Sequence, residues 1–168
     1  SFYKFTVNDK GAIRFGMGAV KGVGRAAVET IVAHRQEQPY TSIFDLTQRI
    51  DLRAANKKSF ESLILAGGLD SLSDAHRSQY FHHNGDGVTF VEKALKYGAQ
   101  HQENEQSSQV SLFGADAAVT IATPELPACE PWTALKELKQ EKEEHQKILN
   151  DRITRMQTEK ESVETKYD

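Results

Sequence analysis

The fold is decided by residues 21–31, which read Lys21-Gly22-Val23-Gly24-Arg25-Ala26-Ala27-Val28-Glu29-Thr30-Ile31. A glycine, an aliphatic residue and a second glycine open directly onto a helical pattern with small and aliphatic residues on its inner face. The glycines let the backbone come close to a phosphate, and the N–H groups that begin the helix point toward it. Lys21 and Arg25 add positive charge. The stretch therefore predicts a turn that binds phosphate groups.

This arrangement is the helix-hairpin-helix pattern, which binds the nucleic-acid backbone and does not read the bases. A second, weaker copy lies at residues 66–72, where two glycines stand between predicted helices. Two such copies pack as a four-helix unit whose hairpins can straddle the minor groove of a duplex. The predicted DNA-binding residues are Lys21, Gly22, Val23, Gly24, Arg25, Lys57, Lys58, Gly67, Gly68 and Arg77.

Two other interpretations of the first glycine turn remain open. Gly22, Gly24 and Ala27 also fit the looser dinucleotide-binding fingerprint, and Asp45 follows at a suitable distance. That fingerprint must directly follow a buried strand, whereas residues 16–18, Gly-Met-Gly, interrupt the preceding segment. The other interpretation is a glycine turn that binds nothing.

The rest of the chain predicts a mainly α protein. Residues 1–16 form a β-hairpin around an Asn-Asp-Lys-Gly turn, and 17–98 form the tandem helix-hairpin-helix domain. Its helices are expected at 25–36, from Ser42, at 56–66, after Ser73 as a cap, and after the turn at 84–87. Residues 99–131 are expected to be a flexible linker, because 100–108 are polar and three prolines follow. A charged helix fills 132–168.

Composition and charge limit the class of protein. The chain has 168 residues with 38% hydrophobic and 27% charged residues, and no apolar run long enough to span a bilayer, so we expect a cytoplasmic protein. Cys129 is its single cysteine. Residues 1–83 carry 11 Lys/Arg and 8 Asp/Glu (+3), 84–135 carry 2 and 7 (−5), and 136–168 carry 8 and 9 (−1). The first half is therefore the candidate surface for nucleic acid.

A second motif, Gln109-Val110-Ser111-Leu112-Phe113, follows the polar run. It resembles the short peptide with which bacterial replication proteins bind the β sliding clamp. An exposed Leu-Phe pair beside a polar segment has nothing nearby to bury it, so it suits an apolar pocket on another protein. The alternative is that both side chains fold back onto the helical domain.

The sequence predicts no catalytic residues and no metal site. His82 and His83 are neighbours on a helix, point in different directions and lack a third ligand. Two-metal phosphoryl transfer needs clustered carboxylates, and no Asp-x-Asp pair stands beside a strand. The chain is therefore expected to be non-catalytic and to need no cofactor. A different class, an interaction scaffold that oligomerises through the C-terminal helix, also remains open.

Taken in order, several motifs over residues 1–143 resemble the bacterial DNA polymerase III alpha subunit. These are Ile13-x-Phe15-Gly16-Met17, Ala19-Val20-Lys21-Gly22-Val23-Gly24, Ile43-Phe44-Asp45, Asn56-Lys57-Lys58, Glu61-Ser62-Leu63, Ala66-Gly67-Gly68-Leu69-Asp70, the Gln109 peptide with Gly114, and Pro131-Trp132. From Glu144 onward the chain departs from the family, so residues 144–168 inherit no family role.

The resemblance implies a fragment that spans the end of the fingers and the tandem helix-hairpin-helix, or clamp-binding, domain. The parent would extend primers as a DNA-directed DNA polymerase with deoxynucleoside triphosphates and magnesium, using aspartates that lie upstream of this segment. The implied partners are duplex DNA, the β sliding clamp and other replicase subunits. The fragment would bind DNA and the clamp without catalysing the reaction.

Overall fold

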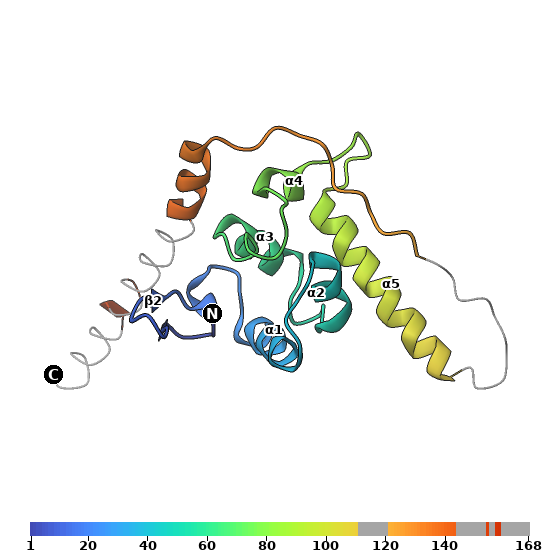
Figure 1. Ribbon diagram of the computed structural model, residues 1–168, viewed down its shortest axis with the longest axis horizontal. Coiled ribbons are helices and arrows are strands. Elements are labelled where there is room, and N and C mark those ends of the chain that lie inside the picture. Colours follow the sequence, from blue (N-terminus) through green and yellow to red (C-terminus); the bar gives the residue numbers. More distant parts are fainter. Residues whose placement is uncertain (111–120, 144–153, 155–156, 159–168) are drawn as a thin grey trace.

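The order of elements is that of a mainly α domain behind a short β-ribbon (Figure 1). The computed structural model describes residues 1–110, 121–143, 154 and 157–158. Within them the prediction of a mainly α chain with an N-terminal hairpin is confirmed. The elements are β1 (Thr6–Val7), β2 (Ile13–Arg14), the 3-10 helix η1 (Met17–Ala19), α1 (Arg25–Glu37), α2 (Ile43–Arg49), α3 (Lys57–Leu65), α4 (Arg77–Phe81) and α5 (Phe90–Val110).

α2 and α3 start close to their predicted positions, and a side-chain cap sets each start. Ser42 Oγ accepts a hydrogen bond from the N–H of Asp45 at 3.1 Å. Asn56 Oδ1 accepts one from the N–H of Ser59, also at 3.1 Å. Each bond satisfies a backbone donor that has no partner inside the helix. These two boundaries therefore follow from local chemistry.

The start of α4 differs from the prediction. The sequence suggested a cap at Ser73, but α4 begins at Arg77, after a capping box formed by His76 and Gln79. Ser73 Oγ lies 3.0 Å from the hydroxyl of Tyr80, whose ring is almost fully buried. A buried hydroxyl needs a hydrogen-bond partner. Ser73 therefore serves as the partner of Tyr80 and does not cap a helix.

One hydrophobic core joins α1 to α5. α2 contacts α5 along its length, while α3 and α4 pack on the first part of α5. The buried hydrophobic residues are Val20, Val23, Ala27, Val28, Ile31, Ile43, Leu46, Ile50, Ala55, Phe60, Leu63, Ile64, Leu69, Tyr80, Phe90, Val91, Ala94 and Tyr97.

α5 extends well past its predicted end, which corrects the expectation of a linker from residue 99. The polar run 100–108 belongs to this helix, which continues to Val110. Its backbone approaches α2 at Gly98, where an added Cβ would lie 2.5 Å from the carbonyl oxygen of Thr47. One turn later, Gln102 Nε2 donates to the carbonyls of Thr47 and Ile50, both at 2.9 Å. Because these contacts come from α2, composition alone could not reveal them.

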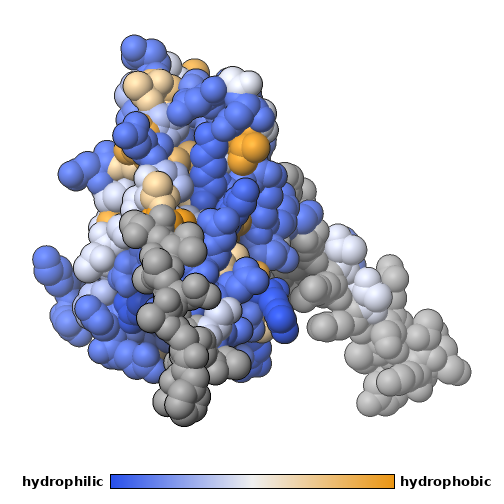
Figure 2. All heavy atoms as spheres, turned by 90° about the vertical axis from the view of Figure 1, so that its right-hand side faces the viewer, coloured by the Kyte–Doolittle hydropathy of each residue, from blue (hydrophilic) through white to orange (hydrophobic). Residues whose placement is uncertain are grey.

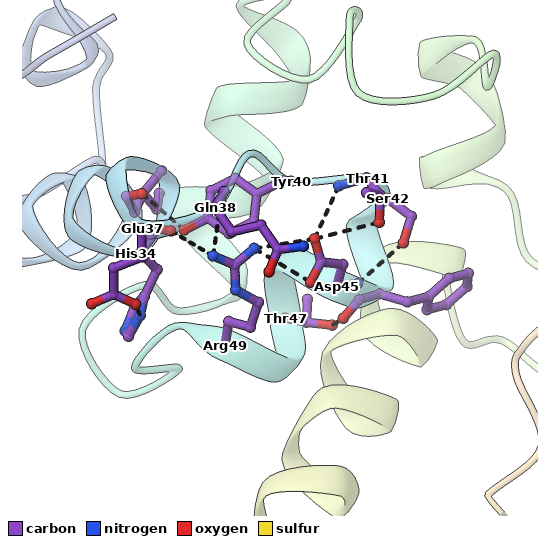
Figure 3. Close-up of polar contacts among 11 residues, drawn as sticks. His34, Glu37, Gln38, Tyr40, Thr41, Ser42, Asp45, Thr47 and Arg49 are labelled. Carbon is purple, nitrogen blue, oxygen red and sulfur yellow. Dashed lines mark hydrogen bonds and ion pairs between the residues drawn. The ribbon is translucent and has the colours of Figure 1, made fainter.

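α1 and α2 are joined by Arg49, which lies at the centre of a polar network (Figure 3). Its guanidinium donates to the carbonyls of His34 and Gln38 at the end of α1 and pairs with Asp45 at 3.2 Å. It also lies over the ring of Tyr40, 4.7 Å from the centroid. The network therefore ties the last carbonyls of α1 to α2, and that of His34 also accepts the N–H of Gln38 at 3.1 Å.

The N-terminal ribbon leans on the helical domain through backbone and ring contacts. Its strands are antiparallel, with Val7 opposite Ile13, and both of these side chains are exposed. The carbonyl of Phe2 accepts a hydrogen bond from the N–H of Met17 at 2.7 Å. The guanidinium of Arg35 on α1 lies over the ring of Phe2, 5.5 Å from its centroid. The ribbon thus keeps an apolar face open to solvent.

Residues 121–133 have no regular secondary structure, as three prolines predict, but they pack against α4. Gln79 Nε2 donates to the carbonyl of Pro127 at 2.8 Å, and Ser78 Oγ donates to that of Glu130 at 2.9 Å. The ring of Trp132 stacks on Phe81 at 5.5 Å. This part of the predicted flexible linker is therefore held on the domain.

A helical stretch at 134–143 follows, within the region where the charged C-terminal helix was predicted. Glu141 reaches back to Arg77, with Oε1 2.6 Å from Nη1. Most of residues 144–168 fall outside the described part. Among the described helices, none is both long and apolar enough to cross a membrane.

Candidate nucleic-acid interface

The first glycine turn is shaped by one left-handed residue between two buried valines. Gly22 has φ +80°, a conformation that other residues rarely adopt. Val20 and Val23 are both buried, and the N–H of Val23 donates to the carbonyl of Val20 at 3.1 Å. The valines fix the turn to the core, while Lys21, Gly22 and Gly24 remain exposed. The backbone of the turn is therefore presented to solvent.

Gly24 leaves the start of α1 open. It is the N-cap of the helix, is extended at φ −73° and ψ 164°, and forms no side-chain capping bond. An added Cβ at this position would meet nothing within 4 Å. The first-turn N–H groups of a helix lack intrahelical partners and carry a partial positive charge. The N–H groups at the start of α1 can therefore donate hydrogen bonds to a phosphate oxygen.

α3 supports this turn from behind, which the sequence did not reveal. Ser59 Oγ donates to the carbonyl of Gly22 at 2.9 Å, across 37 residues of sequence. Lys58 Cγ and Ser62 Oγ each lie 3.3 Å from the position that a Cβ on Gly22 would occupy. The exposed side chain of Lys58 therefore passes beside the first turn, where it adds a third cation to Lys21 and Arg25.

Arg25 is held at the mouth of the turn by two weak partners. Its Nε lies 2.8 Å from Glu29 Oε1, one helical turn along, and both side chains are more than half exposed. Its guanidinium also lies 5.5 Å from the ring centroid of Tyr3. Exposed pairs of this kind contribute little energy and exchange readily for a phosphate. These contacts therefore hold the Arg25 side chain beside the turn and leave it able to bind a phosphate.

The second glycine pair has a different role from the first, which corrects the prediction for Gly67 and Gly68. The N–H of Gly68 donates to the carbonyl of Leu63 at 2.7 Å, and that of Gly67 to the carbonyl of Ile64 at 3.0 Å. With Gly67 at φ +76°, this is a Schellman cap on the end of α3. The amides expected to face DNA are used by the helix itself, and the next helix begins only at Arg77.

Arg77 is buried, contrary to its predicted place on the DNA surface. Its side chain donates to Asp70 and to the carbonyl of Leu65, and it pairs with Glu141. The hydrogen bonds with Asp70, followed by those with Glu141, raise the pKa of the Arg77 guanidinium against the opposing effect of burial. Arg77 therefore joins the end of α3, α4 and the 134–143 helix from inside the protein.

The side chains of Lys57 and Lys58 contact different parts of the protein although the two residues are neighbours in sequence. Lys57 Nζ lies 2.7 Å from Glu92 Oε1 on α5, and the hydrogen bond with Glu92 raises the pKa of the lysine. Lys58 instead lies beside Gly22. Of this predicted pair, only Lys58 adds to the cations around the first turn.

The predicted clamp-binding peptide begins within α5. Gln109 and Val110 are the last two residues of that helix. Ser111, Leu112 and Phe113 lie outside the described residues, so the structure leaves the prediction for them untested. What it establishes is where the peptide begins, at the far end of α5 from Phe90 (Figure 1).

The dinucleotide-binding alternative is not supported by the fold. It requires a buried strand directly before the glycines, whereas η1 precedes them, and β1 and β2 are only two residues long. In the described part of the chain, no three His, Cys, Asp or Glu side chains are grouped so that they could hold a metal ion. An exposed glycine turn with three nearby cations defines the class instead, a helix-hairpin-helix domain.

Comparison with known proteins supports this class and specifies the family. A family described as helix-hairpin-helix motif matches residues 1–80. The DNA polymerase III subunit alpha of Vibrio cholerae is 40% identical over 113 residues, which are 67% of this chain and 9% of that protein. That of Escherichia coli K12 is 36% identical over 136 residues (77% and 11%), and that of Xylella fastidiosa 33% over 145 (85% and 12%).

The chain belongs to the DNA polymerase III subunit alpha family. It spans about a tenth of the length of these relatives.

Proposed function

We propose that this chain binds the sugar-phosphate backbone of duplex DNA through the first glycine turn. The observation that carries the proposal is the open start of α1 at Gly24, with Lys21, Arg25 and Lys58 around it. Backbone N–H groups and flexible cations suit phosphate oxygens and are indifferent to base sequence. Binding should therefore be independent of sequence and sensitive to salt.

A charge-reversal experiment tests this role. Replacing Lys21, Arg25 and Lys58 with Glu should weaken binding to a fluorescent duplex and lower the salt slope by about one for each phosphate that is no longer neutralised. A matched control replaces Lys10, Lys96 and Lys139 with Glu, which changes the net charge equally at exposed positions away from the turn. Equal anisotropy titrations for the two variants would refute the assignment.

The second part of the proposal is a tether to the β sliding clamp through residues 109–113. The support is the resemblance of Gln109-Val110-Ser111-Leu112-Phe113 to clamp-binding peptides, together with the position of its start at the tip of α5. Holding DNA and a ring around that DNA at once keeps the protein at high effective concentration after either contact breaks. The benefit would be processive synthesis.

Calorimetry with purified clamp tests the tether. Leu112→Ala with Phe113→Ala should abolish binding without lowering the melting temperature. Leu126→Ala with Leu135→Ala is a suitable control, because both leucines are exposed on other segments. Unchanged clamp affinity in the first variant would remove this part of the proposal.

The parent activity that fits these contacts is DNA-directed DNA synthesis in the cytoplasm. In such a protein this segment would have no catalytic role, and other replicase subunits would be further partners. Magnesium and deoxynucleoside triphosphates would be bound by a catalytic region elsewhere. A primer-extension assay of the parent protein should therefore show reduced product length, and not loss of nucleotide addition, when residues 109–113 are removed.

A further inference from the structure

α5 is a single helix of 21 residues whose first part packs on the domain and whose residues 105–107 are exposed. The fixed part ends with two contacts to α2. At Gly98 the two backbones are so close that an added Cβ would lie 2.5 Å from the Thr47 carbonyl oxygen. At Gln102 one amide group donates to two carbonyls of α2. The helix is therefore anchored at its middle.

Beyond Gln102 the helix continues away from its anchor. Figure 1 shows this end of α5 extending past α2. Residues 97–110 contain Glu103 and Glu105 and not one Lys or Arg, so this half has no cation with which to grip phosphates. Figure 2, which faces this side of the molecule, shows a mostly hydrophilic surface. The distal half thus suits a solvated spacer better than a further DNA contact.

The helical state of this half depends on the anchor. A polar segment of about eight residues would scarcely be helical on its own, because nucleation is costly. Here the first turns are formed by packing, and each further residue only has to extend them. The anchor at Gly98 and Gln102 therefore transmits a fixed direction to the end of the helix at Val110.

We propose that α5 is a stiff strut that sets the distance and direction between the DNA-binding turn and the start of the clamp-binding peptide at Gln109. This inference rests on the proposed function. The residues beyond Gln102 place the start of the peptide, Gln109, about 10 Å from the anchor, because a helix rises about 1.5 Å per residue. A flexible tether would fix neither quantity. The strut instead allows simultaneous binding of DNA and clamp in one relative orientation.

Helical phase distinguishes a strut from a flexible tether. Two alanines inserted between Glu105 and Gln106 would turn the end of the helix by about 200°, and four would turn it by about 400°, close to one full turn. With a strut, two residues should disturb simultaneous binding more than four. With a flexible tether, both insertions should change it by less than about twofold, because closure entropy varies slowly with length.

The measured quantity is a coupling ratio for the full chain, the dissociation constant on primed duplex alone divided by that on the same duplex encircled by the clamp. We expect a ratio of about 100 for the unaltered chain. The two-residue insertion should reduce the ratio about tenfold, and the four-residue insertion should recover most of it. Equal ratios for the two insertions would overturn the strut.

A second variant keeps the length constant. Glu105→Pro should interrupt the helix and lower the coupling ratio, whereas Glu105→Ala should leave it unchanged. Unaltered coupling in the proline variant would also overturn the strut. Failure of the proposed function gives a different pattern, since the unaltered chain would then show no clamp binding in the absence of DNA. For each variant, clamp affinity measured without DNA should match that of the unaltered chain.

Discussion

The contact between α5 and α2 predicts the effect of replacing Gly98 with Ala on the free energy of unfolding. Helix propensity alone predicts a gain in stability, whereas packing against α2 predicts a loss. Gly98 lies inside a helix, where replacement of Gly by Ala ordinarily stabilises a protein by about 1 kcal/mol. Here the new Cβ would lie 2.5 Å from the oxygen and 2.6 Å from the carbon of the Thr47 carbonyl. These are backbone atoms, so the two helices must move apart. We therefore expect Gly98→Ala to destabilise.

The magnitude follows from three contributions. Overpacking costs about 1–3 kcal/mol. Separation of the helices also strains two hydrogen bonds from Gln102, each contributing about 1 kcal/mol. With about 2 kcal/mol for overpacking, about 1 kcal/mol for the partial loss of both hydrogen bonds and a gain of about 1 kcal/mol in helix propensity, the net loss is about 2 kcal/mol. For a helical unit of this size, that corresponds to a fall in melting temperature of about 8–16 °C.

Thermal and urea denaturation followed by circular dichroism measures this loss. Ala99→Gly is the matched control, because it makes the reverse exchange at the next residue, which is exposed. It should cost only the propensity difference of about 1 kcal/mol. A melting temperature for Gly98→Ala at or above that of the unaltered protein would refute the close approach and the anchor on which α5 depends.

Three further substitutions have defined outcomes. Tyr40→Phe should cost about 1 kcal/mol by removing the hydrogen bond to the Ile31 carbonyl. Burial raises the pKa of Tyr40 to about 12, so this cost should be full below pH 10 and shrink as pH rises toward 12. Glu92→Gln should destabilise at neutral pH. The hydrogen bond with Lys57 lowers the pKa of Glu92 from 4.5 to about 2, so the difference should vanish as pH falls through that range. Gly67→Ala should cost about 1–2 kcal/mol, because φ is +76°.

Urea unfolding at several pH values checks the first two, and a single melting curve checks the third. A Tyr40→Phe difference that grew above pH 10 would contradict the buried neutral phenol. A Glu92→Gln difference that persisted at pH 2 would contradict the role of its carboxylate. Unchanged stability of the Gly67 variant would mean that the end of α3 does not need a left-handed residue.

Sequence reasoning was accurate where a boundary depends on neighbouring residues. The caps at Ser42 and Asn56 and the glycine turn before α1 follow from chemistry within a few positions. The errors lie where distant segments meet. The polar run after residue 99 is helical because Gln102 finds carbonyls on α2, and Arg77 is buried because Asp70 and Glu141 converge on it. Two glycines in a row could not reveal whether their amides face a ligand or cap the preceding helix.

The hydrogen bond from Ser59 to Gly22 also bears on the order of events during synthesis. The partners are separated by 37 residues. A ribosome adds roughly 5–20 residues per second, so the turn emerges seconds before the side chain that fastens it. A nascent chain that ends before α3 would contain the glycine turn without the hydrogen bond from Ser59 that supports it. Competence to grip a phosphate should therefore arise late and all at once, when the third helix docks.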